Sequence, residues 1–504
     1  MPGDPDMTAL PAWDEPSLLS IADFSHARVR LKGAVEAADQ VAGRYRGCVK
    51  NLDGSQLADA FREYEACVAE VQRLSAVAEI IVSAGFAADA ALATLTLCDQ
   101  AWAALSARLS FFESELAEVD PVAVAELAPI MPGGMYHNFY RQVVAAADTA
   151  SSREVSSALA ALRPTGIDGW QALARQLFTR IEVAGTGKGS SLGAMMPKLY
   201  LSDRELRQRS HAAITTALNS ELELRATTLS MIAADGVARA NLCGVSWMHD
   251  SLQSDQMTEA EVKALAAHAV EAYPLAHEYF SLKRQLIGVP ELMDFDRYAP
   301  VTSGEPRISW DEAIAVVLDA FDGVHPSFGE AARRLIDAGH VDACARRGKA
   351  IGPFTKEVPG DSPYISVNFN GTFRNVLTLA HELGHGVHME SARRLPLLSA
   401  TTPRVLAETV ALFFESVTLR SLLAKRTSAD EQLSLSARLI EDRLVSVCRH
   451  AALYEFERAL RNERDDTDPL DAETIGSIWL STQGKFYGSA VELTTDFRPW
   501  WSSL

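Results

Sequence analysis

Residues 381–385 read His-Glu-Leu-Gly-His, and this spacing constrains the surrounding segment to a helix. Positions i and i+4 share one face of an α-helix, so His381 and His385 would stand side by side. Two neutral imidazoles on one face can hold a zinc ion, with Glu382 close to the open side of that ion. The pattern predicts a zinc-binding helix with a carboxylate that serves as general base.

The histidine helix is expected to run from about Thr372, a plausible N-cap, to about Glu390. Gly384 and Gly386 lie inside it, and an interior glycine costs about 1 kcal/mol relative to alanine. That cost indicates close approach of either the ion or a packed backbone. The alternative interpretation is a core helix that carries two hydrogen-bonded histidines.

A third ligand is expected from another helix, because a catalytic zinc usually has three protein ligands and one open position. Glu408 is a lone carboxylate in a strongly apolar segment downstream. Burial of a carboxylate is costly unless the group is paired or binds a metal. We therefore predict Glu408 as the third ligand of one Zn²⁺ ion. The alternative is a surface glutamate on an amphipathic helix.

Two more polar side chains follow the candidate ligands at a spacing of seven residues, about two helical turns. Glu415 follows Glu408 in this way. It either orients a ligand histidine from behind or is an ordinary partly buried glutamate, and the sequence leaves both open. His388 follows His381, and a polar supporting or packing role is favoured over metal ligation.

Composition narrows the class of protein. The formal net charge is −19, which argues against binding to a nucleic-acid backbone. The six cysteines form no Cys-x-x-Cys pair, so neither a disulfide framework nor a thiolate metal site is expected. The acidic N-terminus does not resemble a signal peptide, and no stretch reaches about 18 unbroken apolar residues. We expect a cytoplasmic protein without a membrane span.

Helical periodicity dominates the chain, with long amphipathic helices predicted at 57–87 and 90–118 and another helix at 311–321. The glycine-rich segment 184–193 interrupts this pattern, and its spacing does not match a phosphate-binding loop. It is interpreted as a turn between short strands or a lobe boundary. Residues 364–369 are β-branched and aromatic, which predicts a strand just before the histidine helix.

These motifs resemble the M3 family of zinc metallopeptidases, specifically its oligoendopeptidase F-like branch. The resemblance spans essentially the whole chain and is specific from about Asp294 onward. It rests on the following segments: 294–300, 348–354, 363–365, 379–388, 406–409, 448–457 and 486–493.

The resemblance implies a mostly α, two-lobed helical metallopeptidase fold that encloses a deep channel, with a small β-sheet beside the zinc helix. Residues 1–185 would form an N-terminal helical lobe and residues 186–504 the catalytic domain. His381, His385 and Glu408 would bind zinc. Glu382 would act as general base in hydrolysis of internal bonds of short peptides.

The resemblance also implies that an edge strand pairs with the backbone of the peptide substrate, which places Tyr364, Ser366 and Asn368 at the substrate.

Family members usually continue beyond the position of Leu504, into a segment whose histidine and tyrosine stabilise the oxyanion. Relative to that pattern we expect a catalytic domain truncated at its C-terminal end. Loss of one oxyanion donor typically lowers the rate about 100- to 1,000-fold. Three interpretations stay open: a fragment, an enzyme completed by a second polypeptide, or a specialised protein that binds peptide without efficient hydrolysis.

Overall fold

The computed structural model describes most of the chain, namely residues 10–86, 89–125, 136–148, 153–184, 190–302, 307–346, 348–350, 352–426, 428–462 and 470–503. The described residues form two compact units, each assembled from separate stretches of sequence. Unit 1 comprises residues 1–148, 253–256 and 306–425, and unit 2 comprises the remaining residues, 149–252, 257–305 and 426–504.

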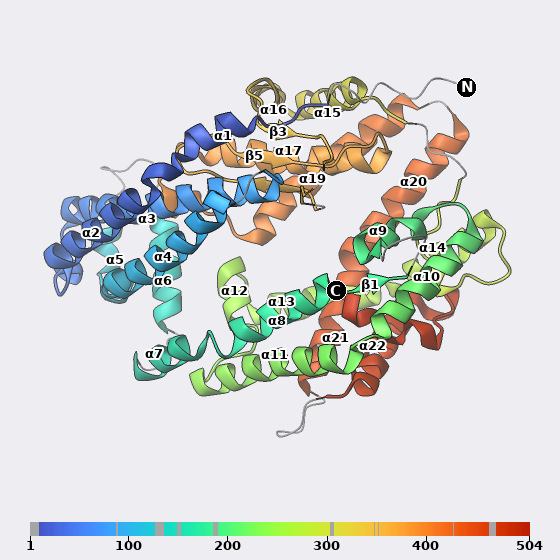
Figure 1. Cartoon of the computed structure of the whole chain (residues 1–504), viewed down its shortest axis with the longest axis horizontal. Coiled ribbons are helices and arrows are strands. Elements are labelled where there is room, and N and C mark those ends of the chain that lie inside the picture. Colours follow the sequence, from blue (N-terminus) through green and yellow to red (C-terminus); the bar gives the residue numbers. More distant parts are fainter. Residues whose placement is uncertain are drawn as a thin grey trace. The chain divides into compact units, whose positions relative to one another are not determined.

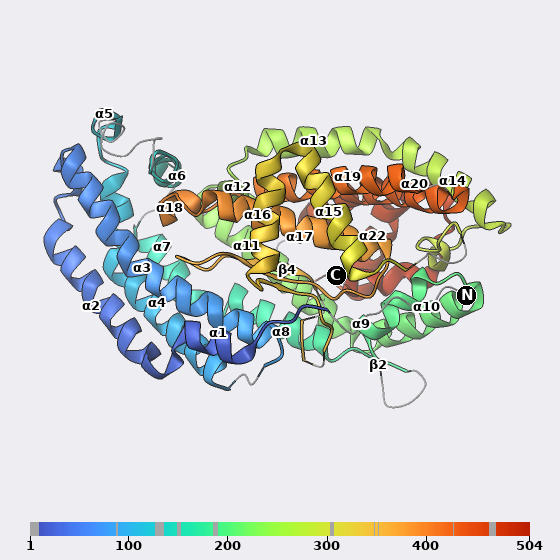
Figure 2. The same ribbon diagram turned by 90° about the horizontal axis from the view of Figure 1, so that it is seen from above.

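Unit 1 begins with a layer of three long helices that pack on one another, α2, α3 and α4 (Figure 2). Asp53 caps α3, and it forms a reciprocal capping box with Gln56. The aromatic rings of Phe61 and Tyr136 stack in the core of this layer, 4.5 Å apart. The helices of this part are α1 (Glu15–Ala22), α2 (Ala27–Tyr45), α3 (Gly54–Ser83), α4 (Asp89–Leu116), α5 (Pro121–Ala125) and α6 (His137–Asp148), with 3₁₀ turns η1 (Phe24–His26) and η2 (Val49–Asn51). The two long helices predicted at 57–87 and 90–118 are confirmed as α3 and α4.

The rest of unit 1 contains a three-stranded sheet with strand order β3-β5-β4. Strand β5 pairs in parallel with β3 and antiparallel with β4. The histidine helix α17 packs on β4, β5, α16 and, most extensively, α19 (Figure 1). The elements are α15 (Trp310–Val324), α16 (Pro326–Asp337), β3 (Val341–Asp342), β4 (Phe354–Lys356), β5 (Tyr364–Ser366), α17 (Phe373–Ala392), α18 (Leu397–Ala400) and α19 (Arg404–Lys425). The helix predicted at 311–321 is confirmed as α15.

Unit 2 is built around an aromatic core in which Trp479, Trp500 and Phe497 are buried. Its helices are α7 (Arg153–Leu162), α8 (Ile167–Thr179), α9 (Leu192–Met195), α10 (Arg204–Asn219), α11 (Leu222–Cys243), α13 (Glu259–Glu271), α14 (Tyr273–Ile287), α20 (Ala429–Leu444), α21 (His450–Asn462) and α22 (Ala472–Tyr487). Unit 2 also has the 3₁₀ segments η3 (Met196–Tyr200), η4 (Asp294–Asp296), η6 (Gly488–Ala490) and η7 (Thr495–Ser503), and the π-helical segment η5 (Val445–Arg449). Helix α12 (His249–Asp255) crosses the sequence boundary between the units.

Two short antiparallel strands pair at the glycine-rich segment of unit 2: β1 (Glu182–Val183) directly precedes the segment and β2 (Ser190–Ser191) lies within it. Of the two interpretations of this segment, a turn between short strands or a lobe boundary, the paired strands favour the first, and residues 184–193 lie within unit 2. Residues 185–189 between them lie outside the described residues.

The predicted fold class, mostly helical with a small sheet beside the histidine helix, is confirmed. The sequence division at residues 185 and 186 and the enclosed channel stay predictions. In the part of the chain that the structure describes, no helix is both long enough and apolar enough to cross a membrane.

Candidate metal centre

Helix α17 presents the two motif histidines on one face. Its N-terminus is fixed by Thr372, whose hydroxyl accepts from Asn375 N while the Asn375 side chain bonds back to Thr372. The helix then runs to Ala392, so the predicted start at Thr372 is confirmed and the end lies two residues beyond the predicted one. The rings of His381 and His385 lie 4.9 Å apart and nearly perpendicular. The i, i+4 spacing thus produces the side-by-side arrangement that it predicts.

Helix α19 brings Glu408 to the same point. Its carboxylate oxygens lie 3.3 Å from His381 Nε2 and 3.7 Å from His385 Nε2. One ligand atom from each of these three residues lies within 4.8 Å of the other two. Ligands held about 2.1 Å from a tetrahedral zinc stand about 3.4 Å from one another. The three donors are therefore close to the spacing that a shared ion needs.

The two interior glycines of α17 permit close packing of its neighbours. A β-carbon at position 384 would lie 3.1 Å from Ala411 Cα on α19. A β-carbon at position 386 would lie 2.8 Å from the Ile365 side chain on β5. Of the two explanations offered for these glycines, packed neighbours are the one that the structure supports. Gly384 in particular lets α19 approach closely enough to carry Glu408 to the histidines.

The side chain of Glu408 is more exposed than the sequence predicts. The sequence argument assumed a buried carboxylate, yet 47% of its side chain is exposed, compared with 21% for His381 and 12% for His385. The assumption of burial is wrong because the apolar residues around Glu408 do not enclose its carboxylate. The carboxylate is instead the most exposed of the three donor groups.

Glu415 contacts the His381 ring at the nitrogen that does not face Glu408. Its carboxylate oxygen Oε2 lies 3.2 Å from His381 Nδ1. Burial alone would lower the pKa of His381, but the hydrogen bond with Glu415 and the charges of Glu382 and Glu408 outweigh it and raise that pKa. A carboxylate on one ring nitrogen fixes the imidazole orientation and leaves the other nitrogen free to bind a metal. The interpretation of Glu415 as a residue that orients a ligand histidine requires a contact with His381, and that contact is present.

Glu382 lies beside the cluster and is only 5% exposed. Burial raises the pKa of its carboxyl group, which the hydrogen bond from Thr355 and the charge of His381 only partly offset. The Thr355 hydroxyl lies 2.8 Å from Glu382 Oε2 and 2.9 Å from the Glu382 carbonyl oxygen. Sequence reasoning missed Thr355, since no motif links β4 to the histidine helix.

His388 is not one of the three clustered donors, although its charge contributes to lowering the pKa of His385. His388 is half-buried, and in the described residues no hydrogen bond joins it to the three donors. Its supporting role stays a prediction. Burial lowers the pKa of this imidazole.

The predicted edge strand is wrong in its position. Strand β5 is central in the sheet, so both of its backbone edges are already paired. Tyr364 is buried against the Trp13 ring, and Ser366 is 1% exposed. The Asn368 amide donates to Ala350 O. A substrate backbone cannot add to β5, because β3 and β4 occupy the positions on either side.

The donor set fits a zinc ion. Two imidazoles and one carboxylate, with a fourth direction open, form one of the common ligand sets of catalytic zinc. The carboxylate behind His381 matches the support that metal-binding histidines usually have. His381, His385 and Glu408 are the residues that would hold the ion.

Comparison with known proteins places the chain in a family. The sequence profile described as "Peptidase family M3" matches residues 198–500. The chain therefore belongs to peptidase family M3, a family of zinc-dependent peptidases, as the motifs indicated.

Individual relatives are distant. The chain is similar to Oligopeptidase PepF of Bacillus subtilis (strain 168), with 22% identity over 323 residues, which cover 64% of this chain and 48% of that protein. It thus spans about half the length of the curated relatives that it matches first.

Solved structures show the same fold. Oligoendopeptidase-F from Enterococcus faecium aligns with a TM-score of 0.66 at 18% identity, covering 96% of this chain and 83% of that one. The structure described as "PZ peptidase A with inhibitor 2" aligns with a TM-score of 0.74 at 16% identity, covering 94% and 82%. At these identities the likeness establishes the helical fold, whereas activity has to be argued from the site.

Proposed function

We propose that this chain is a zinc-dependent endopeptidase that hydrolyses internal bonds of short peptides. The observation that carries the proposal is the convergence of His381, His385 and Glu408 beside the buried carboxylate of Glu382. The relatives support the substrate class, because those that match are oligopeptidases. A zinc ion held by the three donors would supply Lewis acidity to the scissile carbonyl and to the attacking water.

Glu382 is the proposed general base. Its carboxylate is buried, and the residue directly follows the proposed ligand His381, which is the position of the general base in this motif. The Thr355 hydroxyl engages Oε2, which leaves Oε1 to take the proton of the attacking water and later to deliver it to the leaving amine. Thr355 thereby acts as a positioning residue that holds the carboxylate in one orientation.

Strand β4 replaces β5 as the proposed substrate-binding strand. It lies at the edge of the three-stranded sheet, and in the described residues its other edge has no strand partner. It also packs directly on α17. An extended peptide could add to Phe354–Lys356 through main-chain hydrogen bonds and so lie along the histidine helix.

The proposal of a second polypeptide is not supported by the comparisons, and it stays a prediction together with the cytoplasmic location.

The experiment that tests the proposal is turnover of a quenched-fluorescent peptide library by Glu382→Gln. Removal of a general base typically lowers kcat by about 100- to 10,000-fold. We expect a loss in that range with zinc content unchanged. Glu330→Gln, an exposed glutamate on α16, is the matched control and should retain full turnover. Full activity in Glu382→Gln would show that another group moves the proton.

A further inference from the structure

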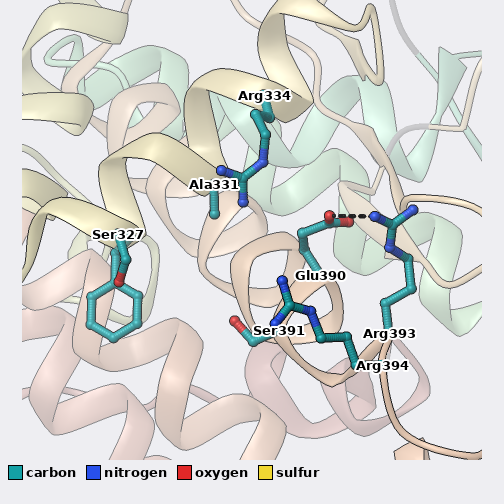
Figure 3. Close-up of a pocket in the computed structure, with 8 residues that line it drawn as sticks. Ser327, Ala331, Arg334, Glu390, Ser391, Arg393 and Arg394 are labelled. Atoms are coloured by element: carbon teal, nitrogen blue, oxygen red, sulfur yellow. Dashed lines mark ion pairs between the residues drawn. The ribbon is translucent and has the colours of Figure 1, made fainter.

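A cavity of about 430 Å³ lies between α16 and the end of α17 (Figure 3). Glu390 on its wall is five residues beyond His385, which places it about 140° around the helix from that metal-site histidine. The same face carries Gly386, where the Leu335 side chain of α16 approaches closely. The cavity is therefore separate from the metal centre, on the other side of the same helix.

Three arginines surround this cavity: Arg334 on α16, and Arg393 and Arg394 directly after α17. Arg393 is already paired, since its guanidinium lies 3.1 Å from Glu390 Oε1. Glu390 also accepts from the Ser362 hydroxyl at 3.0 Å. Its carboxylate is therefore occupied and does not neutralise the other two arginines.

Arg334 and Arg394 differ from Arg393, because in the described residues no carboxylate is paired with their guanidinium groups. Within the described residues, neither side chain makes an ion pair or a hydrogen bond. Figure 3 shows the two guanidinium groups extending from opposite sides toward the space between the helices. The neighbouring Arg333 is instead paired with Asp322. Both side chains are exposed, and two cations that face one cavity create a local positive potential that attracts an anion, in a chain of formal net charge −19.

The chemistry of two guanidinium groups favours a phosphate group as that anion. A guanidinium binds phosphate oxygens through parallel N–H bonds, and two of them match the double negative charge of a phosphomonoester. The hydroxyls on the wall are engaged elsewhere, because Ser391 donates to Val387 O and Ser327 Oγ lies 2.8 Å from His325 Nδ1. The arginines are therefore the donors that remain for a ligand.

The remainder of the wall suits an organic group attached to the phosphate. Phe328 and Ala331 line the cavity with apolar surface. A volume near 430 Å³ falls within the usual range for small-molecule sites, about 300–1,000 Å³. We propose that this pocket binds a small phosphomonoester, such as a nucleoside or sugar phosphate, with its phosphate between Arg334 and Arg394.

The test is calorimetric titration of the full chain with adenosine 5′-monophosphate, ribose 5-phosphate, inorganic phosphate and succinate. We expect saturable binding of at least one phosphomonoester, weakened at least about 10-fold in the double variant Arg334→Ala/Arg394→Ala. The matched control is Arg28→Ala/Arg141→Ala, which removes two exposed arginines of the same unit outside the pocket. The control should bind like the wild type, which excludes a general effect of net charge.

Three results would overturn the proposal. The first is that no phosphate compound binds at up to about 10 mM. The second is binding that the double variant retains while its melting temperature matches that of the wild type. The third is tighter binding of succinate than of any phosphate, which would identify a dicarboxylate site. Equal binding of inorganic phosphate and the phosphomonoesters would support the phosphate contact and remove the role of the apolar wall.

Discussion

Two groups of histidine and acidic side chains can be compared, one in each unit. In unit 1, His381 and His385 converge on Glu408, whose side chain is about half exposed. In unit 2, His211 stacks flat on Trp500 at 4.6 Å, and its Nε2 lies 3.6 Å from Asp294 Oδ1. The first group offers three donors around one open point. The second is a single buried pair of one imidazole and one carboxylate.

Two buried acidic residues in this part of unit 2, Asp294 and Asp296, link segments that are distant in the sequence. Asp294 accepts from the backbone N–H and the hydroxyl of Thr494, which ties η4 to the segment before η7. Asp296 is fully buried and accepts from Arg204 and Arg207 on α10. Nearness of histidine to carboxylate therefore does not identify a metal centre. Convergence of several donors on one point is the additional feature that a metal centre requires.

The largest effect on stability is expected at Asp296. Asp296→Ala would leave the buried Arg207 cation without its carboxylate, at a cost of about 3–5 kcal/mol in unfolding free energy. Glu408→Ala should change that free energy by less than about 1 kcal/mol in metal-free protein, because the side chain is half exposed. Urea unfolding in the presence of a chelator measures both. If the two substitutions lowered the unfolding free energy equally, the distinction between Asp296 as a structural residue and Glu408 as a functional residue would be wrong.

A second test concerns the support of His381. Glu415→Gln should weaken zinc affinity by about 10- to 100-fold, since loss of the carboxylate behind a ligand histidine usually has this effect. Competition with a chromophoric chelator gives the affinity, and Glu330→Gln serves as the exposed control. An unchanged zinc affinity in Glu415→Gln would assign this glutamate to packing alone.

The third test uses pH. Burial lowers the pKa of His211 to about 4; Asp294 opposes the shift and Arg297 adds to it. The unfolded imidazole therefore takes up a proton between pH 6.5 and 4 that the folded one does not, so stability falls as pH falls through this window. At pH 5 the loss amounts to about 2 kcal/mol.

Substitution His211→Phe keeps a flat ring on Trp500 and should remove this part of the pH dependence. The measurement is the unfolding free energy at pH 7 and pH 5 in the wild type and the variant. Parallel declines in the two proteins would mean that His211 is protonated in the folded state.

The smallest effect is expected at Thr355. Thr355→Val keeps the shape of the side chain but removes the hydroxyl that holds Glu382, and we expect kcat to fall about 10-fold at unchanged KM. Thr355→Ser should restore most of the rate. Zinc content should stay the same in both variants. If Thr355→Val raised KM and left kcat unchanged, the hydroxyl would contribute to substrate binding and not to the position of Glu382.

The sequence predicted those features that depend on interactions between residues close together in the chain. The histidine helix, its cap at Thr372 and the pairing of His381 with His385 follow from helical periodicity and capping. Glu408 was found by a weaker signal, a single charge in an apolar segment. Its contact with the histidines is as expected, but its exposure is not, because exposure depends on how neighbouring elements enclose the side chain.

The features that the sequence did not predict depend on pairing between segments that are distant in the sequence. Strand β5 is central because Val341–Asp342 and Phe354–Lys356 pair on either side of it, and neither short segment has a strong strand signal. Thr355 reaches Glu382 only through this sheet, across 27 residues of sequence. Arg334 on α16 and Arg394 just after α17, the arginines proposed to bind phosphate, lie 60 residues apart in the sequence and have no shared motif.

The most direct test of the account is the zinc content of purified protein by mass spectrometry, in the wild type and in His385→Ala and His211→Phe. The account predicts about one zinc ion per chain in the wild type and in His211→Phe, and almost none in His385→Ala. Wild-type protein that stays free of zinc after supplementation, or a His385→Ala variant that keeps its ion, would contradict it.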